Sequence, residues 1–160
     1  MTNRKFGANR SNAFSLIELV IVVVIIAIIG AIAIPKMSRG AAGASDAALV
    51  QNLSIIRAAL ELYQTENGGA YPLQANVVAA LTTYSDGAGN TNLTKTATFI
   101  YGPYLRAIPA LPVGARKGGT GIAGVDGTGV GWIYTPATGA IAANTTATEV
   151  DAKGIAYNLY

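Results

Sequence analysis

The pattern of hydrophobic and polar positions sets an N-terminal segment apart from the rest of the chain. Residues 1–13 are polar and basic and show no apolar periodicity. Residues 19–34 contain no polar side chain, so a helix formed there is hydrophobic on every side. On a helical rise, residues 14–34 span about 31 Å, close to the thickness of the hydrocarbon core of a bilayer. We therefore predict a membrane-spanning helix that is surrounded by lipid or by other subunits.

The next segment shows the periodicity of an amphipathic helix. Apolar side chains recur at intervals of four, three, four and three residues, at Leu49, Leu53, Ile56, Leu60 and Tyr63. Such a stripe predicts a helix with one face on a core. Gly68 and Gly69 are a strong stop signal, so the helix is expected to end at about residue 66. We predict one long helix from Phe14 onward, bent at Pro35 because proline lacks the backbone N–H.

Residues 67–129 are predicted to be a loop region with little regular structure. A short helix is expected at 77–84, followed by a polar loop at 89–96. Residues 99–112 contain three prolines and therefore cannot form a central strand. The glycine-rich stretch 114–131 is predicted to be a mobile surface loop.

The C-terminal residues 130–160 have the pattern of a small β-sheet. Residues 130–134 and 140–143 are expected to form a hairpin, and the alternation at 155–160 predicts a third, half-buried strand. So small a sheet needs the amphipathic helix to cover its apolar face. Three aromatic residues are expected to fill that contact: Trp132, Tyr134 and Tyr157. The predicted fold class is α+β, a long N-terminal helix packed on a small antiparallel sheet.

Charge and composition narrow the possible functions. The net charge is +3, but removing Arg4, Lys5 and Arg10 of the leader leaves equal numbers of basic and acidic side chains. The basic excess therefore suits a cytoplasmic flank of a membrane helix, and no nucleic-acid partner is expected. The chain has no Cys and no His, which excludes disulfides, Cys-based zinc sites and a histidine general base.

Glu18 is the one charged residue within the apolar run. A carboxylate well inside a bilayer costs on the order of 3 kcal/mol, so it needs a partner or a function. No Lys or Arg occurs at 14–35 to supply a cation. A chain cut before Phe14 would carry a free ammonium that could pair with Glu18 of an adjacent copy. The alternative is that Glu18 lies near one membrane face and reaches the headgroups.

This N-terminus resembles that of type IV pilins and type II secretion pseudopilins. The resemblance consists of a basic leader, a Phe-Ser-Leu-Ile-Glu-Leu run and an Ala-Ile-Pro sequence at the family's spacing from Phe14. The matching residues are Phe14, Ser15, Leu16, Ile17, Glu18, Leu19, Ala33, Ile34 and Pro35. The residue before the expected cut is Ala13, where the family usually has Gly, and the glycine inside the helix is Gly30, one turn nearer the proline than usual.

The resemblance implies a processing and assembly pathway. Prepilin peptidase would cleave between Ala13 and Phe14, and Phe14 would be N-methylated. The chain would span the bacterial inner membrane once, with its head outside the cytoplasm, held by lipid before assembly. Many copies would then form a homo-oligomeric helical filament, periplasmic or at the cell surface, in which Glu18 faces a neighbour's amine. An inner-membrane platform and a cytoplasmic ATPase would drive assembly.

The resemblance also implies three parts: a cleaved leader at 1–13, a filament-core helix at 14–38 and a pilin-like head at 39–160. Both a secretion pseudopilus and a surface pilus use such a stalk. The absence of Cys slightly favours a secretion system or a simple pilus system, because many type IV pilins close their C-terminal region with a disulfide and pseudopilins more often lack one. The segment Gly102-Pro103-Tyr104-Leu105 is similar to one that packs across the head of major pseudopilins.

No cofactor, metal or catalytic site is predicted. The glycines at 119, 121 and 124 formally match a dinucleotide-binding fingerprint, but no strand precedes them and no helix-forming sequence follows. Asp126 could join backbone carbonyls at a calcium ion, but the acidic cluster of calcium-binding pseudopilins is missing, so no site is assigned. An anchored enzyme would need a catalytic base from Asp or Glu, and the head's candidates after Glu61 show no paired motif: Glu66, Asp86, Asp126, Glu149 and Asp151.

Two other interpretations of the whole chain remain open. One is a minor pilin that acts as a binding, adhesion or DNA-uptake module at a filament tip. Its candidate surface is a basic and aromatic group, namely Tyr101, Tyr104, Arg106, Arg116 and Lys117. The other is a signal-anchored or secreted soluble domain, because Ala42-Gly43-Ala44 before Ser45 fits a conventional signal-peptide cleavage site.

Overall fold

The computed structural model describes residues 14–160, with the side chains of 33–39 left out of the description. The predicted leader, including Ala13, and the side chain of Pro35 lie outside the described residues, and so does the predicted proline kink. The chain divides into two compact units, Met1–Gly40 and Ala41–Tyr160, which are described separately below. The second unit is called the head.

Helix α1, Leu16–Glu66, begins in the first unit and ends in the head. All five residues of the predicted apolar stripe are at most 3% exposed, which confirms the periodicity argument. The helix ends where the two glycines follow it. Gly68 and Gly69 both have positive φ, and the Gly69 N–H donates to the carbonyl of Gln64 at 2.8 Å. This bond, from the second residue past the cap to the carbonyl five positions earlier, is a Schellman motif.

The main sheet has three strands in the order β3-β4-β5. β4, Val130–Thr135, and β5, Ala140–Ala143, form the predicted antiparallel hairpin, in which Trp132 faces Ala143. β3, Gly121–Ala123, pairs with β4 in parallel. The sheet is therefore mixed rather than antiparallel throughout, while the α+β class is as predicted.

Two of the C-terminal predictions were wrong. The third strand comes from the glycine-rich stretch that was expected to be a loop, whereas 155–160 ends in a short 3-10 helix, η1, Tyr157–Leu159. The glycines allow β3 and the turn before it to approach β4 closely. A Cβ on Gly131 would stand 2.1 Å from the carbonyl oxygen of Gly119. Only a backbone without side chains at this point permits such an approach.

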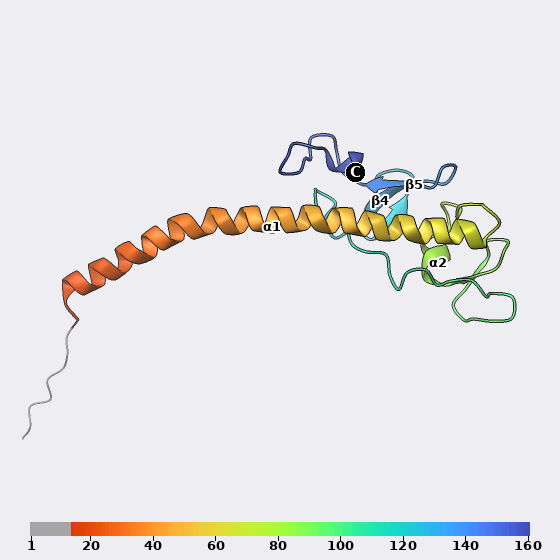
Figure 1. Ribbon diagram of the computed structural model, residues 1–160, viewed down its shortest axis with the longest axis horizontal. Helices are drawn as coiled ribbons and strands as arrows, with labels where there is room; N and C mark the ends of the chain where they lie inside the picture. Colours follow the sequence, from red (N-terminus) through yellow and green to blue (C-terminus); the bar gives the residue numbers. More distant parts are fainter. Residues whose placement is uncertain (1–13) are drawn as a thin grey trace, which may run out of the picture. The chain divides into compact units, whose positions relative to one another are not determined.

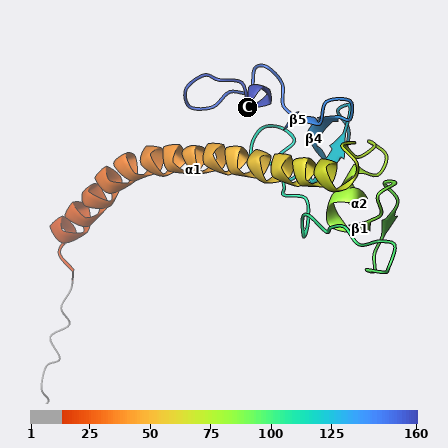
Figure 2. The same ribbon diagram turned by 45° about the vertical axis from the view of Figure 1, so that its right-hand side comes forward.

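The region between α1 and the sheet contains three short elements. Helix α2, Val77–Thr82, is two residues shorter than predicted, because Tyr84 belongs to strand β1, Tyr84–Ser85. β1 pairs antiparallel with β2, Thr91–Asn92, inside the stretch predicted to be a polar loop. Figures 1 and 2 show β4 and β5 on one side of α1 and α2 on the other. The stripe of α1 is thus covered from two directions.

The core is centred on two aromatic side chains of β4. Trp132 and Tyr134 are 0% and 1% exposed, as predicted. The Trp132 Nε1–H donates to the Pro109 carbonyl at 2.8 Å, and the Tyr134 hydroxyl donates to the Pro72 carbonyl at 2.9 Å. These bonds satisfy the polar atoms of both rings and attach the loop segments to the sheet.

The proline-containing segment 99–112 forms no central strand, as predicted. Its Tyr104 and Leu105 N–H groups both donate to the carbonyl of Leu81 in α2. The Tyr104 hydroxyl donates to Glu66 at 2.7 Å and also accepts a bond from Asn67. Burial and the contact with Glu66 raise the pKa of Tyr104 to about 12. This segment therefore fastens α2 to the end of α1.

The last residues, 149–160, bind back onto α1. The Tyr157 hydroxyl donates to Asp46 Oδ1 at 2.8 Å, and the Arg57 guanidinium donates to the carbonyls of Ile141 and Tyr160. Tyr157 is half-buried, so it contributes to the core as predicted and also forms a polar link to the helix. Asp151 organises this segment by accepting bonds from the N–H groups of Lys153 and Ile155.

Candidate functional site

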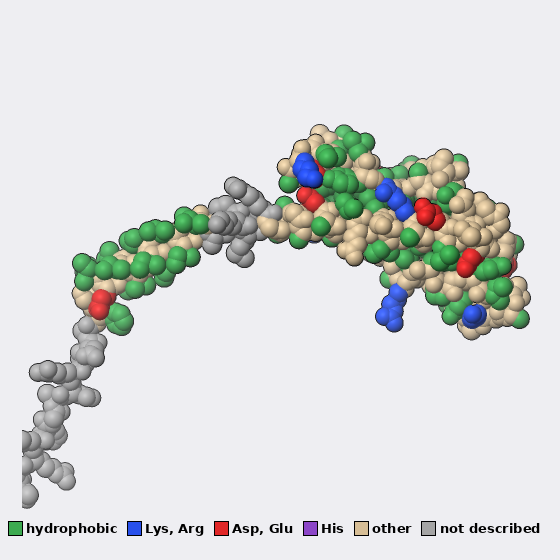
Figure 3. Space-filling model, viewed as in Figure 1, with side chains coloured by type: hydrophobic (Ala, Val, Ile, Leu, Met, Phe, Trp, Pro, Cys, Tyr) green, Lys and Arg blue, Asp and Glu red, His purple; other side chains and the backbone are tan. Residues whose placement is uncertain are grey.

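The candidate site is the start of α1, at residues 14–32. Every large apolar side chain there is exposed, from 47% for Val20 to 84% for Phe14. The large buried apolar side chains of the head, by contrast, are at most 8% exposed. Figure 3 shows the resulting apolar surface of this segment. A continuous surface of Val, Ile and Leu far exceeds the apolar patches that soluble monomers show to water. The segment therefore requires a covering that the described part of the chain does not provide.

The start of the helix is fixed by a capping interaction. The Ser15 N–H donates to Glu18 Oε2 at 2.8 Å, and the Leu19 N–H closes the first helical bond to the Ser15 carbonyl at 3.2 Å. Ser15 stands just before the helix and Glu18 is its third residue, so this bond is the acidic half of a capping box. This role of Glu18 was not predicted, although Ser-x-x-Glu before an apolar run is the sequence signal for it.

Capping occupies only one oxygen of Glu18. Within the described part of the chain, Oε1 makes no hydrogen bond, and no cation lies within ion-pair distance of the carboxylate. Glu18 is exposed. Its charge is favourable at a helix N-terminus, where the unpaired N–H groups create a partial positive charge. The carboxylate can therefore cap its own helix and still accept a bond from an ammonium group of another chain.

Some of the other residues predicted for this site lie outside the residues that the structure describes. Phe14 is described and is exposed; Ala13 and the side chains of Ala33, Ile34 and Pro35 are not described. Gly30 has open space around its Cβ position, so it marks no close contact within the chain. Searched over the described residues alone, no helix is both long enough and apolar enough to cross a bilayer.

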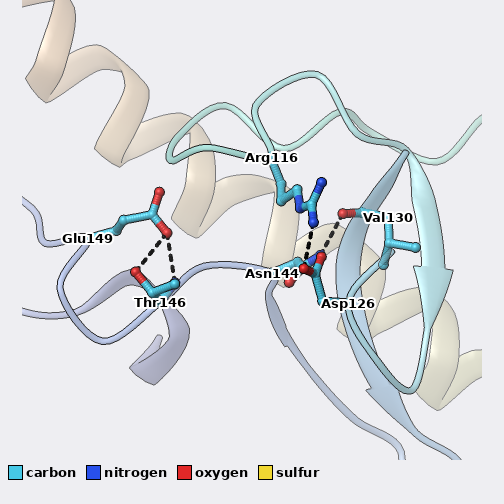
Figure 4. Close-up of polar contacts among 6 residues, drawn as sticks. All are labelled: Arg116, Asp126, Val130, Asn144, Thr146 and Glu149. Carbon is cyan, nitrogen blue, oxygen red and sulfur yellow. Dashed lines mark hydrogen bonds and ion pairs between the residues drawn. The ribbon is translucent and has the colours of Figure 1, made fainter. Parts of the chain in front are cut away.

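The basic and aromatic group suggested for a binding tip is partly used internally. The Arg116 guanidinium pairs with Asp126 at 2.5 Å, and Asn144 donates to the same carboxylate at 2.8 Å (Figure 4). Both bonds hold the pKa of Asp126 below its usual value, and the bond from Arg116 has the larger effect. Arg106 and Lys117 are exposed.

The carboxylates considered for an anchored enzyme organise loops instead. Asp86 accepts bonds from Ala88 and Asn90, and Glu149 from Ala115 and Thr146, the last shown in Figure 4. These bonds lower the pKa of both acids, which keeps them ionised as acceptors. Among the residues described, no group of three or more acidic side chains is arranged to hold a metal ion.

Comparison with known proteins bears on the N-terminal segment. Residues 8–34 match the family model of the prokaryotic N-terminal methylation motif. This chain carries the N-terminal signal of type IV pilins and pseudopilins. The match contains the expected cleavage position at Ala13, the residue expected to be methylated, Phe14, and the acid Glu18. No curated protein and no solved structure matches the chain. The motif implies processing by prepilin peptidase and assembly into a filament.

Proposed function

We propose that this chain is a structural subunit of a membrane-assembled filament, either a type II secretion pseudopilus or a type IV pilus-like fibre. The observation that carries the proposal is the exposed apolar helix, whose first turn is capped by the acid Glu18 and lies within the match to the methylation motif. Such a helix serves no catalytic purpose, but it can be covered first by lipid and later by identical helices. The head would then face outward as a folded module that needs no cofactor.

The proposed pathway starts in the inner membrane. Residues 19–34 contain no polar side chain, which supports a single membrane span, and the basic leader supports a cytoplasmic N-terminus. Prepilin peptidase cuts between Ala13 and Phe14, and Phe14 is N-methylated. The chain is then extracted into the filament by a membrane platform and a cytoplasmic ATPase. The filament is periplasmic for a secretion system and at the cell surface for a pilus.

In this proposal Glu18 decides between membrane and filament. A carboxylate in the bilayer costs on the order of 3 kcal/mol, and this cost destabilises the membrane state. In the filament, the free oxygen of Glu18 accepts a bond from the ammonium of a neighbouring Phe14, while the other oxygen stays on its own helix. Charge-assisted bonds of this kind are about twice as strong as neutral ones. Both effects favour the assembled state.

Analysis of the mature N-terminus tests the processing step. Protein isolated from membranes of the native host should have an intact mass corresponding to a start at Phe14 plus one methyl group, and N-terminal sequencing should give methylated Phe. A start at Ser45 would show an ordinary signal peptide and would contradict the proposal. Deleting the gene separates the two filament types, because loss of protein secretion indicates a pseudopilus and loss of surface fibres a pilus.

A further inference from the structure

Three asparagines of the head stand in the sequence pattern Asn-x-Ser/Thr, in which the middle residue is not proline. They are Asn52, Asn92 and Asn144. This pattern marks asparagines that can accept a glycan in exported proteins, but a pattern so short also arises by chance in a chain rich in threonine. A folded head can carry a glycan only on an amide nitrogen that is accessible and that no internal bond needs.

Two of the three asparagines use their amide nitrogens to hold the head together. Asn144 is 7% exposed, and its Nδ2 donates at 2.8 Å to Asp126 and to the Val130 carbonyl (Figure 4). The Nδ2 of Asn52, on α1, donates to the Ala110 carbonyl at 3.1 Å. A glycan on either nitrogen would disturb these bonds, and at Asn144 it would also need space inside a closely packed head. Both positions therefore suit packing rather than modification.

Asn92 differs from the other two, because it ends strand β2 and begins an exposed loop. Its Oδ1 accepts a bond from the Thr94 N–H at 2.9 Å, and within the described part of the chain its Nδ2 donates to no group. A backbone N–H can only donate, so this bond fixes which amide atom is the nitrogen. Asn92 itself is half-buried, Leu93 is 85% exposed, and residues 94–98 are exposed. The nitrogen of Asn92 is thus uncommitted and lies beside an accessible segment.

The loop that begins at Asn92 also lacks polar cover. Residues 91–100 contain a single charged side chain, Lys95, while Leu93 and Ile100 are 85% and 47% exposed. A glycan is bulky and hydrated and makes a surface more soluble. Attached at Asn92, it would add polar surface next to these apolar side chains without displacing any part of the core.

We propose that Asn92 is an N-glycosylation site, which receives its glycan from a lipid diphosphate carrier. In the transfer, the Asn92 Nδ2 forms a bond to the anomeric carbon of the first sugar, and the bond from that carbon to the diphosphate oxygen breaks. The lipid diphosphate leaves with the bonding electrons, and one amide proton passes to a base of the transferase. The choice of a lipid-linked donor rests on the proposed function, in which the head is outside the cytoplasm and away from nucleotide sugars.

The test is mass spectrometry of the protein isolated from membranes of its native host and digested with trypsin. Cleavage after Lys and Arg puts the three asparagines on separate peptides, namely 40–57, 58–95 and 118–153, and the expected mature N-terminus on a fourth, 14–36. We expect peptide 58–95 to carry the added mass of a glycan, and peptides 40–57 and 118–153 to have their unmodified masses.

The same digest separates failure of this proposal from failure of the proposed function. Peptide 58–95 at its unmodified mass would overturn the glycan, whatever the state of peptide 14–36. A glycan on peptide 40–57 or 118–153 would also overturn it, because it would show that internal bonds do not exclude modification. An N-terminus other than methylated Phe14 would contradict the proposed function and leave the glycan result standing.

Variants of the loop assign the attachment to one atom. Asn92→Gln removes the acceptor and Thr94→Val removes the hydroxyl of the pattern, so both should lose the glycan completely. Thr94→Ser keeps the hydroxyl and should keep the glycan, and Thr98→Val, in the same exposed loop, should leave it unchanged. A glycan that persists on peptide 58–95 of Asn92→Gln would be attached to a hydroxyl and would overturn the proposal. Loss in Thr98→Val or in Thr94→Ser would contradict recognition of the pattern and would overturn it as well.

Discussion

Residues 14–32 and the head use the same aliphatic residues in opposite ways. In the head, Leu49, Leu53 and Ile56 are at most 1% exposed, because strands and loops far along the chain cover them. At 14–32, Val and Ile residues remain about half exposed or more. The head is therefore complete as a single copy, while the apolar segment is incomplete without lipid or other copies. Hydrophobic residues of the head thus stabilise its fold, whereas those at 14–32 are available to contact lipid or other copies.

The largest effect is expected from a charge placed in the covered face of α1. Ile56→Asp puts a carboxylate at a site that is 0% exposed and should destabilise the head by about 4 kcal/mol or more, enough to unfold many small domains. The matched control is the preceding residue, Ile55, which is 41% exposed. Ile55→Asp should lower the free energy of unfolding by less than about 1 kcal/mol. Urea unfolding of the full chain in detergent measures both. Equal losses would show that the outer face of α1 is covered within the chain.

Assembly should fail when the charge of Glu18 is removed. Glu18→Ala leaves the ammonium of a neighbouring Phe14 unpaired in an apolar bundle, which costs on the order of 3 to 5 kcal/mol. The variant should accumulate as processed, membrane-bound protein with a folded head and few filaments, counted by electron microscopy of sheared fractions. Glu61→Ala removes an exposed acid from the head part of the same helix and should assemble normally.

Glu18→Gln separates the two roles of this residue. Glutamine serves in a capping box, so it preserves the bond to the Ser15 N–H but carries no charge. We expect it to assemble as poorly as Glu18→Ala. Filaments at the normal yield from Glu18→Gln would reduce Glu18 to a helix cap and remove the ion pair from the proposal.

Alkaline pH should weaken the head through its buried tyrosine. The pKa of Tyr134 is raised from 10.0 to about 12, mainly by burial, so the folded state keeps a proton that the unfolded state loses. This contribution is complete below pH 10 and is lost as pH rises toward 12, by on the order of 2 kcal/mol. Tyr134→Phe should remove one part of the pH dependence between 10 and 12, as measured by the urea midpoint, because the pKa values of Tyr104 and Tyr157 are also raised to about 12. An unchanged slope would exclude Tyr134 as its source.

The smallest effect is expected at the exposed pair of Arg116 and Asp126. Arg116→Ala should lower the melting temperature of the head slightly, and only at low salt, because ions screen exposed pairs. The pKa of Asp126 is lowered by Arg116 and Asn144, so its contribution is present above the ordinary value of 3.8 and is lost as pH falls through the lowered one. A large loss at high salt would mean that the pair holds the fold together.

The parts of the molecule that could be predicted from sequence depend on local periodicity. The stripe at Leu49 to Tyr63 and the stop at Gly68 follow from spacing alone, and burial confirms them. The methylation motif is likewise a contiguous string, which the family model matches. The capping role of Glu18 could also be predicted from the local sequence Ser-x-x-Glu. The prediction from the sequence concerned its charge in an apolar run instead.

The wrong predictions concern pairings that no local pattern encodes. β3 is three residues long and only Ile122 in it is buried, so glycines rather than apolar alternation allow it to pair. At the C-terminus, the alternation of Ile155, Tyr157 and Leu159 with Ala156, Asn158 and Tyr160 is typical of a half-buried strand. The hydroxyls of Tyr157 and Tyr160 instead bind Asp46, on α1, and Asp151.

The attachment of the last residues to α1 has a consequence for the newly made chain. The bonds of Arg57 to Ile141 and of Asp46 to Tyr157 join residues 84 and 111 positions apart. At a synthesis rate of about 5–20 residues per second, the stripe of α1 exists for roughly 3 to 13 seconds before β4 begins to cover it. During that time the stripe lacks its cover on the side of β4, although the residues of α2 have already been made. A ribosome that stalls before residue 130 therefore leaves a chain whose stripe is covered from one direction at most, a ready substrate for proteases.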